Sequence, residues 1–84
     1  IENFVNSRMT PEVDIIVYPN PTNGNLNINS NKKVDVIIFD MLGNRIIDIQ
    51  QVQKEIDISN LPNGIYNMSI IYNNKRFNKR IIKQ

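Results

Sequence analysis

The fold is decided near the C-terminal end, where residues 65–83 read IYNMSIIYNNKRFNKRIIK. The first eight of these residues are rich in β-branched and aromatic side chains, which favour strands. Asn73-Asn74 then fits a two-residue hairpin turn, because Asn tolerates a positive φ. In Lys75–Lys83, Phe77 and Ile81 fall on one face of a strand. The stretch therefore predicts a β-hairpin.

Short strands separated by tight turns continue upstream of this hairpin. No window keeps a 3.6-residue apolar period, so no helix is expected. The predicted strands, counted from the N-terminal end, are Asp14–Tyr18, Asn25–Asn29, Lys33–Asp40, Arg45–Gln50, Glu55–Ile58, Ile65–Tyr72 and Lys75–Lys83. About seven strands at this spacing favour an all-β fold, an immunoglobulin-like antiparallel β-sandwich, with a small barrel as the alternative. The predicted core contains Leu26, Ile28, Val36, Ile38, Ile56, Ile58 and Ile70.

Prolines, glycines and two anchor residues are predicted to shape the turns. Pro19-Asn20-Pro21 followed by Gly24 indicates a rigid corner between two strands, because proline fixes φ. Gly43 and Gly64 are predicted turn positions at which a Cβ would clash. Leu61 and Tyr66 are predicted to anchor the core edge, with the Tyr66 hydroxyl bonded to a backbone group, as in tyrosine corners of sandwich folds.

The composition excludes most catalytic and metal chemistry. The chain has 84 residues, enough for one domain, and contains no His and no Cys. Imidazole and thiolate nucleophiles, bases and ligands are therefore missing. Asp40 and Asn44 are the best oxygen donors for a cation, but no Asp-x-Asp run supports them, so we expect no catalytic residue, no cofactor and no metal site.

Charge is distributed unevenly along the chain. Residues 1–58 contain five basic and eight acidic residues, a net of −3, whereas residues 59–84 contain five basic residues and no acid, a net of +5. The five cations are Lys75, Arg76, Lys79, Arg80 and Lys83. One interpretation is an edge strand kept soluble by its charges. The other is a strand offered to a partner by β-augmentation, with its cations facing an acidic groove. Only Phe77 interleaves with these cations as an aromatic residue, so no nucleic-acid partner is expected.

Residues 1–13 show no clean periodicity, and Pro11 interrupts them. They are interpreted as a linker, or the tail of an upstream region, and residues 14–84 as the folded domain. The longest unbroken apolar stretches, such as Ile15–Tyr18 and Val36–Phe39, are much shorter than the roughly 20 residues of a membrane span, so no direct membrane insertion is expected.

Three turn motifs recur in a recognisable order. They are Tyr18-Pro-Asn-Pro-Thr-Asn-Gly24, Phe39-Asp-Met-Leu-Gly-Asn-Arg45 and Ile56-Asp-Ile-Ser-Asn-Leu-Pro-Asn-Gly-Ile-Tyr66, and the basic strand ending Lys79-Arg-Ile-Ile-Lys83 follows them. From about Asp14 onward this pattern resembles the C-terminal sorting domain of type IX (Por) secretion cargo in Bacteroidetes.

The resemblance implies a non-catalytic sorting signal with a seven-stranded immunoglobulin-like fold. Such a signal directs an upstream cargo across the outer membrane, after transit through the periplasm, to the cell surface or the extracellular space. The implied partners are the type IX translocon, its shuttle components and a sortase-like peptidase that removes the domain, here by cutting near residues 1–13. The residues expected to be recognised lie in the last strand and are Lys75, Arg76, Lys79, Arg80, Ile81, Ile82 and Lys83, above all Lys79, Arg80 and Lys83.

A second hypothesis is an immunoglobulin-like accessory module that binds a carbohydrate or a protein at the cell surface. Carbohydrate modules commonly present exposed aromatic platforms. The aromatic residues here are Phe4, Tyr18, Phe39, Tyr66, Tyr72 and Phe77, and most of them alternate into the predicted core, which disfavours sugar binding.

Overall fold

The computed structural model describes residues 15–30 and 32–84. Within these residues there are seven strands and no helix, and the bounds are β1 Ile16–Tyr18, β2 Asn25–Asn29, β3 Val34–Phe39, β4 Arg45–Val52, β5 Glu55–Asp57, β6 Gly64–Tyr72 and β7 Lys75–Lys83. The strands form a three-stranded sheet of order β1-β2-β5 and a four-stranded sheet of order β4-β3-β6-β7, with antiparallel pairing throughout. The proposed linker at residues 1–13 and the predicted strand start at Asp14 lie outside the described residues.

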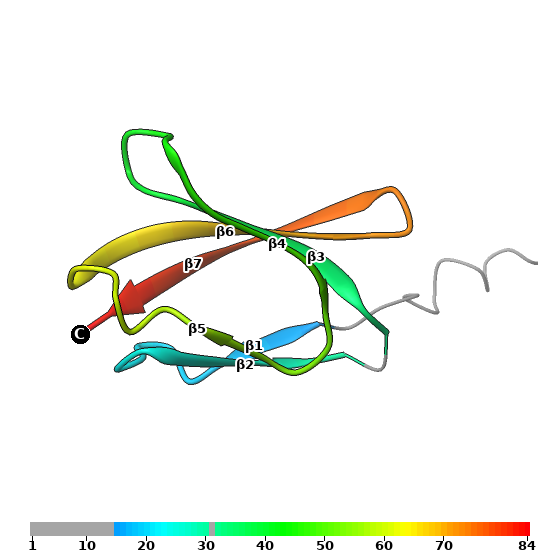
Figure 1. The fold of residues 1–84 in the computed structure, drawn as a ribbon, viewed down its shortest axis with the longest axis horizontal. Helices are drawn as coiled ribbons and strands as arrows, with labels where there is room; N and C mark the ends of the chain where they lie inside the picture. Colours follow the sequence, from blue (N-terminus) through cyan, green and yellow to red (C-terminus); the bar gives the residue numbers. More distant parts are fainter. Residues whose placement is uncertain (1–14, 31) are drawn as a thin grey trace, which may run out of the picture.

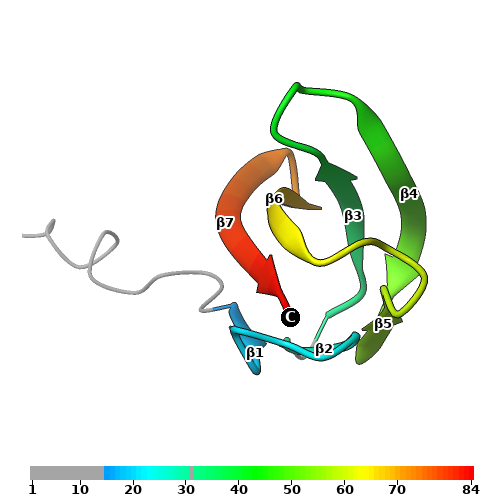
Figure 2. The same ribbon diagram turned by 90° about the vertical axis from the view of Figure 1, so that its left-hand side faces the viewer.

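The two sheets face each other, as Figures 1 and 2 show, and enclose the core. The predicted antiparallel β-sandwich is confirmed, and the barrel alternative is wrong. Every core residue predicted from the sequence is buried. The buried hydrophobic residues are Ile15, Leu26, Ile28, Val34, Val36, Ile38, Val52, Ile56, Ile58, Tyr66, Met68, Ile70 and Ile81.

The β6–β7 hairpin has the predicted two-residue turn. Asn73 and Asn74 have φ values of 55° and 64°, the left-handed pair that a type I′ turn requires. The strands then pair without a break from Tyr72 opposite Lys75 to Gly64 opposite Lys83. The hairpin is thus the longest regular ladder of the molecule's described part, and it fixes which face of β7 points to the core.

β4 runs two residues further than the sequence predicted. We expected it to end at Gln50, but it continues to Val52, which is buried and pairs with Val34. Gln51 takes a φ of 61° in an irregular stretch of the ladder, and its backbone N–H donates to the Asp35 carboxylate (3.1 Å). Such an irregularity interrupts the two-residue alternation, so the inward position of Val52 cannot be read from periodicity.

Tyr66 forms the predicted tyrosine corner. It lies near the start of β6, is 6% exposed, and donates its hydroxyl hydrogen bond to the backbone carbonyl of Pro62. Leu61, as predicted, is half-buried and packs against the core. Both residues fix the loop between β5 and β6 to the sandwich, in the way that this corner does in immunoglobulin-like domains.

Candidate recognition surface on the last strand

β7 is an edge strand of the four-stranded sheet, so one of its sides faces away from β6. Lys75 and Tyr72 flank the two-residue turn as a hydrogen-bonded pair, and backbone groups alternate sides along a strand. The odd-numbered residues of β7 therefore bond to β6, and the even-numbered residues direct their N–H and C=O groups outward. The contacts of Ile82 and Gln84, described next, agree with this assignment.

Residues 19–22, called the strap here, cover the C-terminal half of this outward side. The Asn20 side chain bonds twice to the backbone of β7, accepting from the Ile82 N–H (2.9 Å) and donating to the Arg80 carbonyl (2.7 Å). Thr22 continues the pairing, because its N–H donates to the Ile82 carbonyl and its carbonyl accepts from the Gln84 N–H, both at 2.8 Å. The strap thus joins the two sheets and occupies the edge from Arg80 to Gln84.

The strap corresponds to the proline motif of the sequence, and both of its prolines follow cis peptide bonds. We predicted a rigid corner, and the chain does turn there between β1 and β2. The contacts of Asn20 and Thr22 with the last strand were not predicted from the sequence. The available signal was a polar residue enclosed by two prolines, whose missing N–H groups leave side-chain amides and the Thr22 backbone to form the bonds.

The structure divides the predicted recognition residues between the two faces of β7. Arg76, Arg80 and Ile82 are exposed and lie on the outer face of the sheet. Ile81 is fully buried, and Lys83 is only 8% exposed. The Lys83 ammonium group donates to the Asn63 side-chain oxygen at 3.2 Å. A partner of the folded domain therefore has no access to the Ile81 side chain and little to Lys83. Lys79 is half-buried on the same inner side, and Lys75 is exposed near the turn.

Arg76 and Arg80 are not neutralised by the fold. Their cross-strand neighbours on β6 are Ile71 and Asn67, which carry no charge. Neither arginine has an ion-pair partner within residues 15–30 and 32–84, whereas Arg45 pairs with Asp48 at 3.2 Å. Two uncompensated guanidinium groups thus remain in water on the outer face.

The structural reason for a glycine at positions 43 and 64 differs from the predicted one. A Cβ at Gly43 or Gly64 would meet nothing within 4 Å, so the expected clash is absent at both positions. Gly64 is also the first residue of β6 and not part of a turn. Gly43 instead supplies a φ of +90°. The close contact is at Gly24, where a Cβ would lie 3.0 Å from Ser59 Cα and Cβ.

The turn between β3 and β4 is closed by a carboxylate. Asp40 Oδ1 accepts from the N–H groups of Leu42 and Asn44, each at 2.9 Å, and Oδ2 accepts from the Asn44 side-chain amide at 3.0 Å. The side-chain bond from Asn44, followed by the backbone bonds, lowers the pKa of Asp40 below 3.8. The two oxygen donors that we weighed as cation ligands bond to each other in this turn. The tip is apolar, with Met41 57% and Leu42 87% exposed, and this exposure was not predicted from the sequence.

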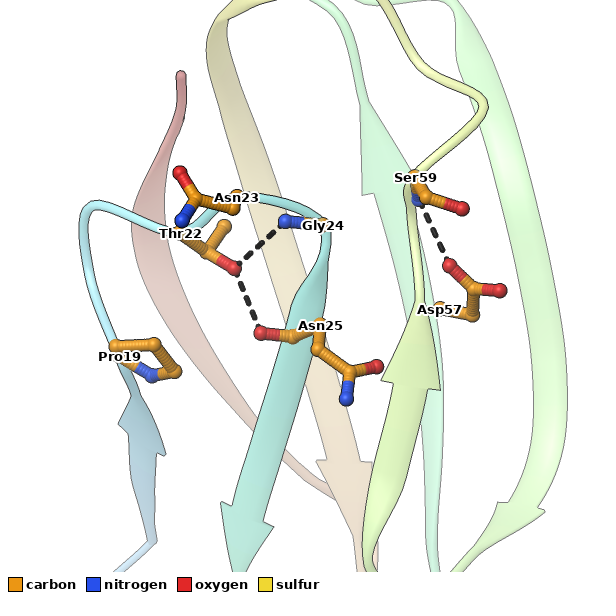
Figure 3. Close-up of a pocket in the computed structure, with 7 residues that line it drawn as sticks. All are labelled: Pro19, Thr22, Asn23, Gly24, Asn25, Asp57 and Ser59. Atoms are coloured by element: carbon orange, nitrogen blue, oxygen red, sulfur yellow. Dashed lines mark hydrogen bonds between the residues drawn. The ribbon is translucent and has the colours of Figure 1, made fainter.

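An open depression of about 420 Å³ lies beside the strap (Figure 3). It is lined by Pro19, Thr22, Asn23, Gly24, Asn25, Asp57 and Ser59. Thr22 Oγ1 donates to the Asn25 carbonyl (2.6 Å) and accepts from the Gly24 N–H (3.1 Å). Asp57 accepts from the Ser59 N–H at 2.8 Å, and hydrogen bonds from the side chain and backbone of Ser59 lower its pKa. The hydrogen bonds of Thr22 thus stabilise the turn before β2, and the hydrogen bond of Asp57 stabilises the start of the loop after β5.

Two further kinds of feature, a metal site and a membrane-spanning helix, are not found in residues 15–30 and 32–84. No group of three or more His, Cys, Asp or Glu residues that could hold a metal ion occurs in the described part of the chain. A helix long and apolar enough to cross a membrane is likewise missing from those residues. What remains is an antiparallel β-sandwich with a cationic, partly covered edge strand.

This class of domain can now be placed in a family. The family model of the secretion system C-terminal sorting domain matches residues 16–84, and the chain belongs to this family of type IX secretion sorting domains of Bacteroidetes. A search of curated proteins found no match. Membership indicates a C-terminal sorting signal that interacts with the type IX secretion system as part of a cargo precursor. It implies export to the cell surface or the extracellular space, and the family is in general non-catalytic.

Proposed function

We propose that this chain is a non-catalytic sorting signal that is recognised through the exposed cations of its last strand. Its cargo passes the periplasm, and the translocon and shuttle components then carry it across the outer membrane. A sortase-like peptidase cuts near residues 1–13. The observation that carries this proposal is the position of Arg76 and Arg80, which are exposed on an edge strand and face the uncharged Ile71 and Asn67 across the ladder.

The accessory-module alternative finds less support. Tyr18, at 49% exposure, is the most exposed aromatic side chain in the described part of the chain, whereas Tyr66 is buried and Phe39, Tyr72 and Phe77 are half-buried. One ring does not form a platform for a sugar.

The test is a transport assay with variants that keep the fold. A fluorescent passenger with a Sec signal is fused in front of residues 1–84 and expressed in a bacterium with a working type IX system. We expect Arg76→Gln with Arg80→Gln to reduce surface or extracellular passenger at least fivefold. The matched control is Lys32→Gln with Lys54→Gln, which removes two exposed cations elsewhere.

Truncating the last residues would be a poorer test, because it would also remove the buried Ile81 from the core. Wild-type export of the arginine variant would refute recognition through these cations. Periplasmic retention of the wild-type fusion, with its domain folded, would refute the sorting function itself.

A further inference from the structure

The N-terminal half of β7 has an open backbone edge. Arg76 and Asn78 are even-numbered, so their N–H and C=O groups point away from β6, and no bond to them from the described residues is present. The strap begins to cover the edge only at the Arg80 carbonyl. Figure 1 shows the turn of this hairpin at the end of the molecule away from the C-terminus. An unpaired edge of this kind is a template for another strand.

The other sheet edges are less suited to pairing with an added strand. β1 and β5 have three residues each, which limits the number of backbone bonds that a partner could form. β4 is longer, but its pairing with β3 shifts register twice and Gln51 has a positive φ. Such irregular edges twist away from regular pairing and protect a sheet against strand addition. The long and regular edge is that of β7.

The side chains beside the open edge define the chemistry of a matching strand. Arg76 and Arg80 stand four residues apart on the outer face, and no acid within residues 15–30 and 32–84 pairs with them. Phe77 lies between them on the opposite face, where it is half-buried and packs against the core. A strand paired here places alternate residues near the two arginines and the residues between them near Phe77. Carboxylates fit the first set and apolar side chains the second.

We propose that residues 76–80 accept, by β-augmentation, an extended segment of a partner protein in which acidic and apolar residues alternate. A second copy of this chain does not fit, because pairing β7 with β7 brings like charges opposite each other. That the partner segment belongs to the export machinery rests on the proposed function. The strand-pairing itself does not.

The binding test uses the isotope-labelled chain of residues 1–84 and a capped ten-residue peptide of alternating Glu and Val. We expect the amide signals of Arg76, Asn78 and Arg80 to shift and their hydrogen exchange to slow. Replacing Glu by Gln in the peptide weakens binding at least threefold at low ionic strength, and the difference disappears at about 1 M salt, where charges are screened within about 3 Å.

Proline variants locate the pairing. Asn78→Pro removes an outward N–H that β6 does not use, and we expect it to weaken peptide binding at least tenfold. It also deprives the Ser69 hydroxyl of its acceptor, which lies 2.9 Å away. Arg76→Pro is therefore the second variant, because it leaves that bond intact. The matched control is Asp48→Pro, at an outward position of the β4 edge, which leaves peptide binding unchanged.

Shifts confined to β1 or β4, equal losses with Asp48→Pro, or self-association without peptide would overturn the proposal. The transport assay separates the two hypotheses. If Asn78→Pro, which leaves both arginines in place, abolishes peptide binding but leaves passenger export at the wild-type level, strand addition is not the sorting contact, while the sorting function stands. Loss of export together with loss of binding supports both.

Discussion

The contacts of the strap predict that the Asn20 side chain contributes to the stability of the domain. This side chain is exposed, yet both of its amide atoms bond to the backbone of the last strand, at 2.9 Å to the Ile82 N–H and 2.7 Å to the Arg80 carbonyl. It therefore acts as a short piece of strand added to the edge of β7. Asn20→Ala removes both bonds and leaves the Thr22 pairing as the remaining backbone contact.

The size of the effect follows from the two bonds. A hydrogen bond of this kind contributes about 0.5–1.5 kcal/mol net, and water can replace both partners at this exposed position, so we expect a loss of about 1–2 kcal/mol in the free energy of unfolding. For a domain of this length each kcal/mol lowers Tm by about 4–8 °C. The Tm of Asn20→Ala should therefore be lower by roughly 4–16 °C.

The assay is thermal and urea unfolding of residues 1–84, with Asn23→Ala as the matched control. Asn23 is exposed in the same turn, and its side chain forms no hydrogen bond with the described residues. Its replacement should change stability by less than about 0.5 kcal/mol. Equal effects of the two substitutions, or no effect of Asn20→Ala, would refute the reasoning.

A second substitution at Asn20 tests the direction of the bonds. Asn20→Asp keeps the acceptor for the Ile82 N–H but turns a carboxylate oxygen toward the Arg80 carbonyl. This contact favours the protonated acid, so the pKa of the introduced group rises on folding. The variant should then match the wild type most closely below the unfolded pKa and lose stability as pH rises through the folded pKa. An unfolding profile that runs parallel to the wild type between pH 3 and 7 would contradict this, both pH limits being roughly chosen around the ordinary Asp pKa.

The remaining predictions concern the turns. Gly24→Ala should destabilise the domain by more than about 2 kcal/mol in urea unfolding, because its Cβ would lie 3.0 Å from Ser59 and its φ is +147°. Tyr66→Phe should cost about 1 kcal/mol in the same assay, since the Pro62 carbonyl loses its donor. The lowered pKa of Asp40 stabilises the fold above its unfolded value of 3.8 and stops doing so as pH falls. Asp40→Asn should therefore flatten the acid limb of the stability profile, and an unchanged limb would rule out this role.

The sequence predicted the strands well because local chemistry specifies them. Asn73 and Asn74 form a turn type that requires a positive φ at both positions. In β2, the alternation of Leu26 with its Asn neighbours determines which face of the strand is buried. Val52 escaped prediction because an irregularity in the ladder breaks that alternation. Local rules hold only where the ladder stays regular.

The candidate site was harder to predict, because its defining contacts join distant parts of the chain. Asn20 and Arg80 are 60 residues apart, and no local pattern reveals that one covers the other. Charge counting located the basic strand and favoured Lys79, Arg80 and Lys83, but it could not show which of these side chains the fold leaves exposed. The pleat of β7 sorts them, with Arg76 and Arg80 in water and Ile81 and Lys83 buried.

The division of the β7 side chains between solvent and core affects how a partner can recognise this signal. If β7 were recognised as a linear peptide, nine residue pairs with β6 and the bonds of the strap would have to open first. The side chains released would include Ile81, whose burial in the core contributes of the order of 2 kcal/mol. Recognition of the folded hairpin avoids these costs, because its open half already presents backbone groups and cations to solvent. The strap then has a second consequence: by covering the edge from Arg80 onward, it confines a strand-pairing partner to residues 76–80 and so sets the register of the contact.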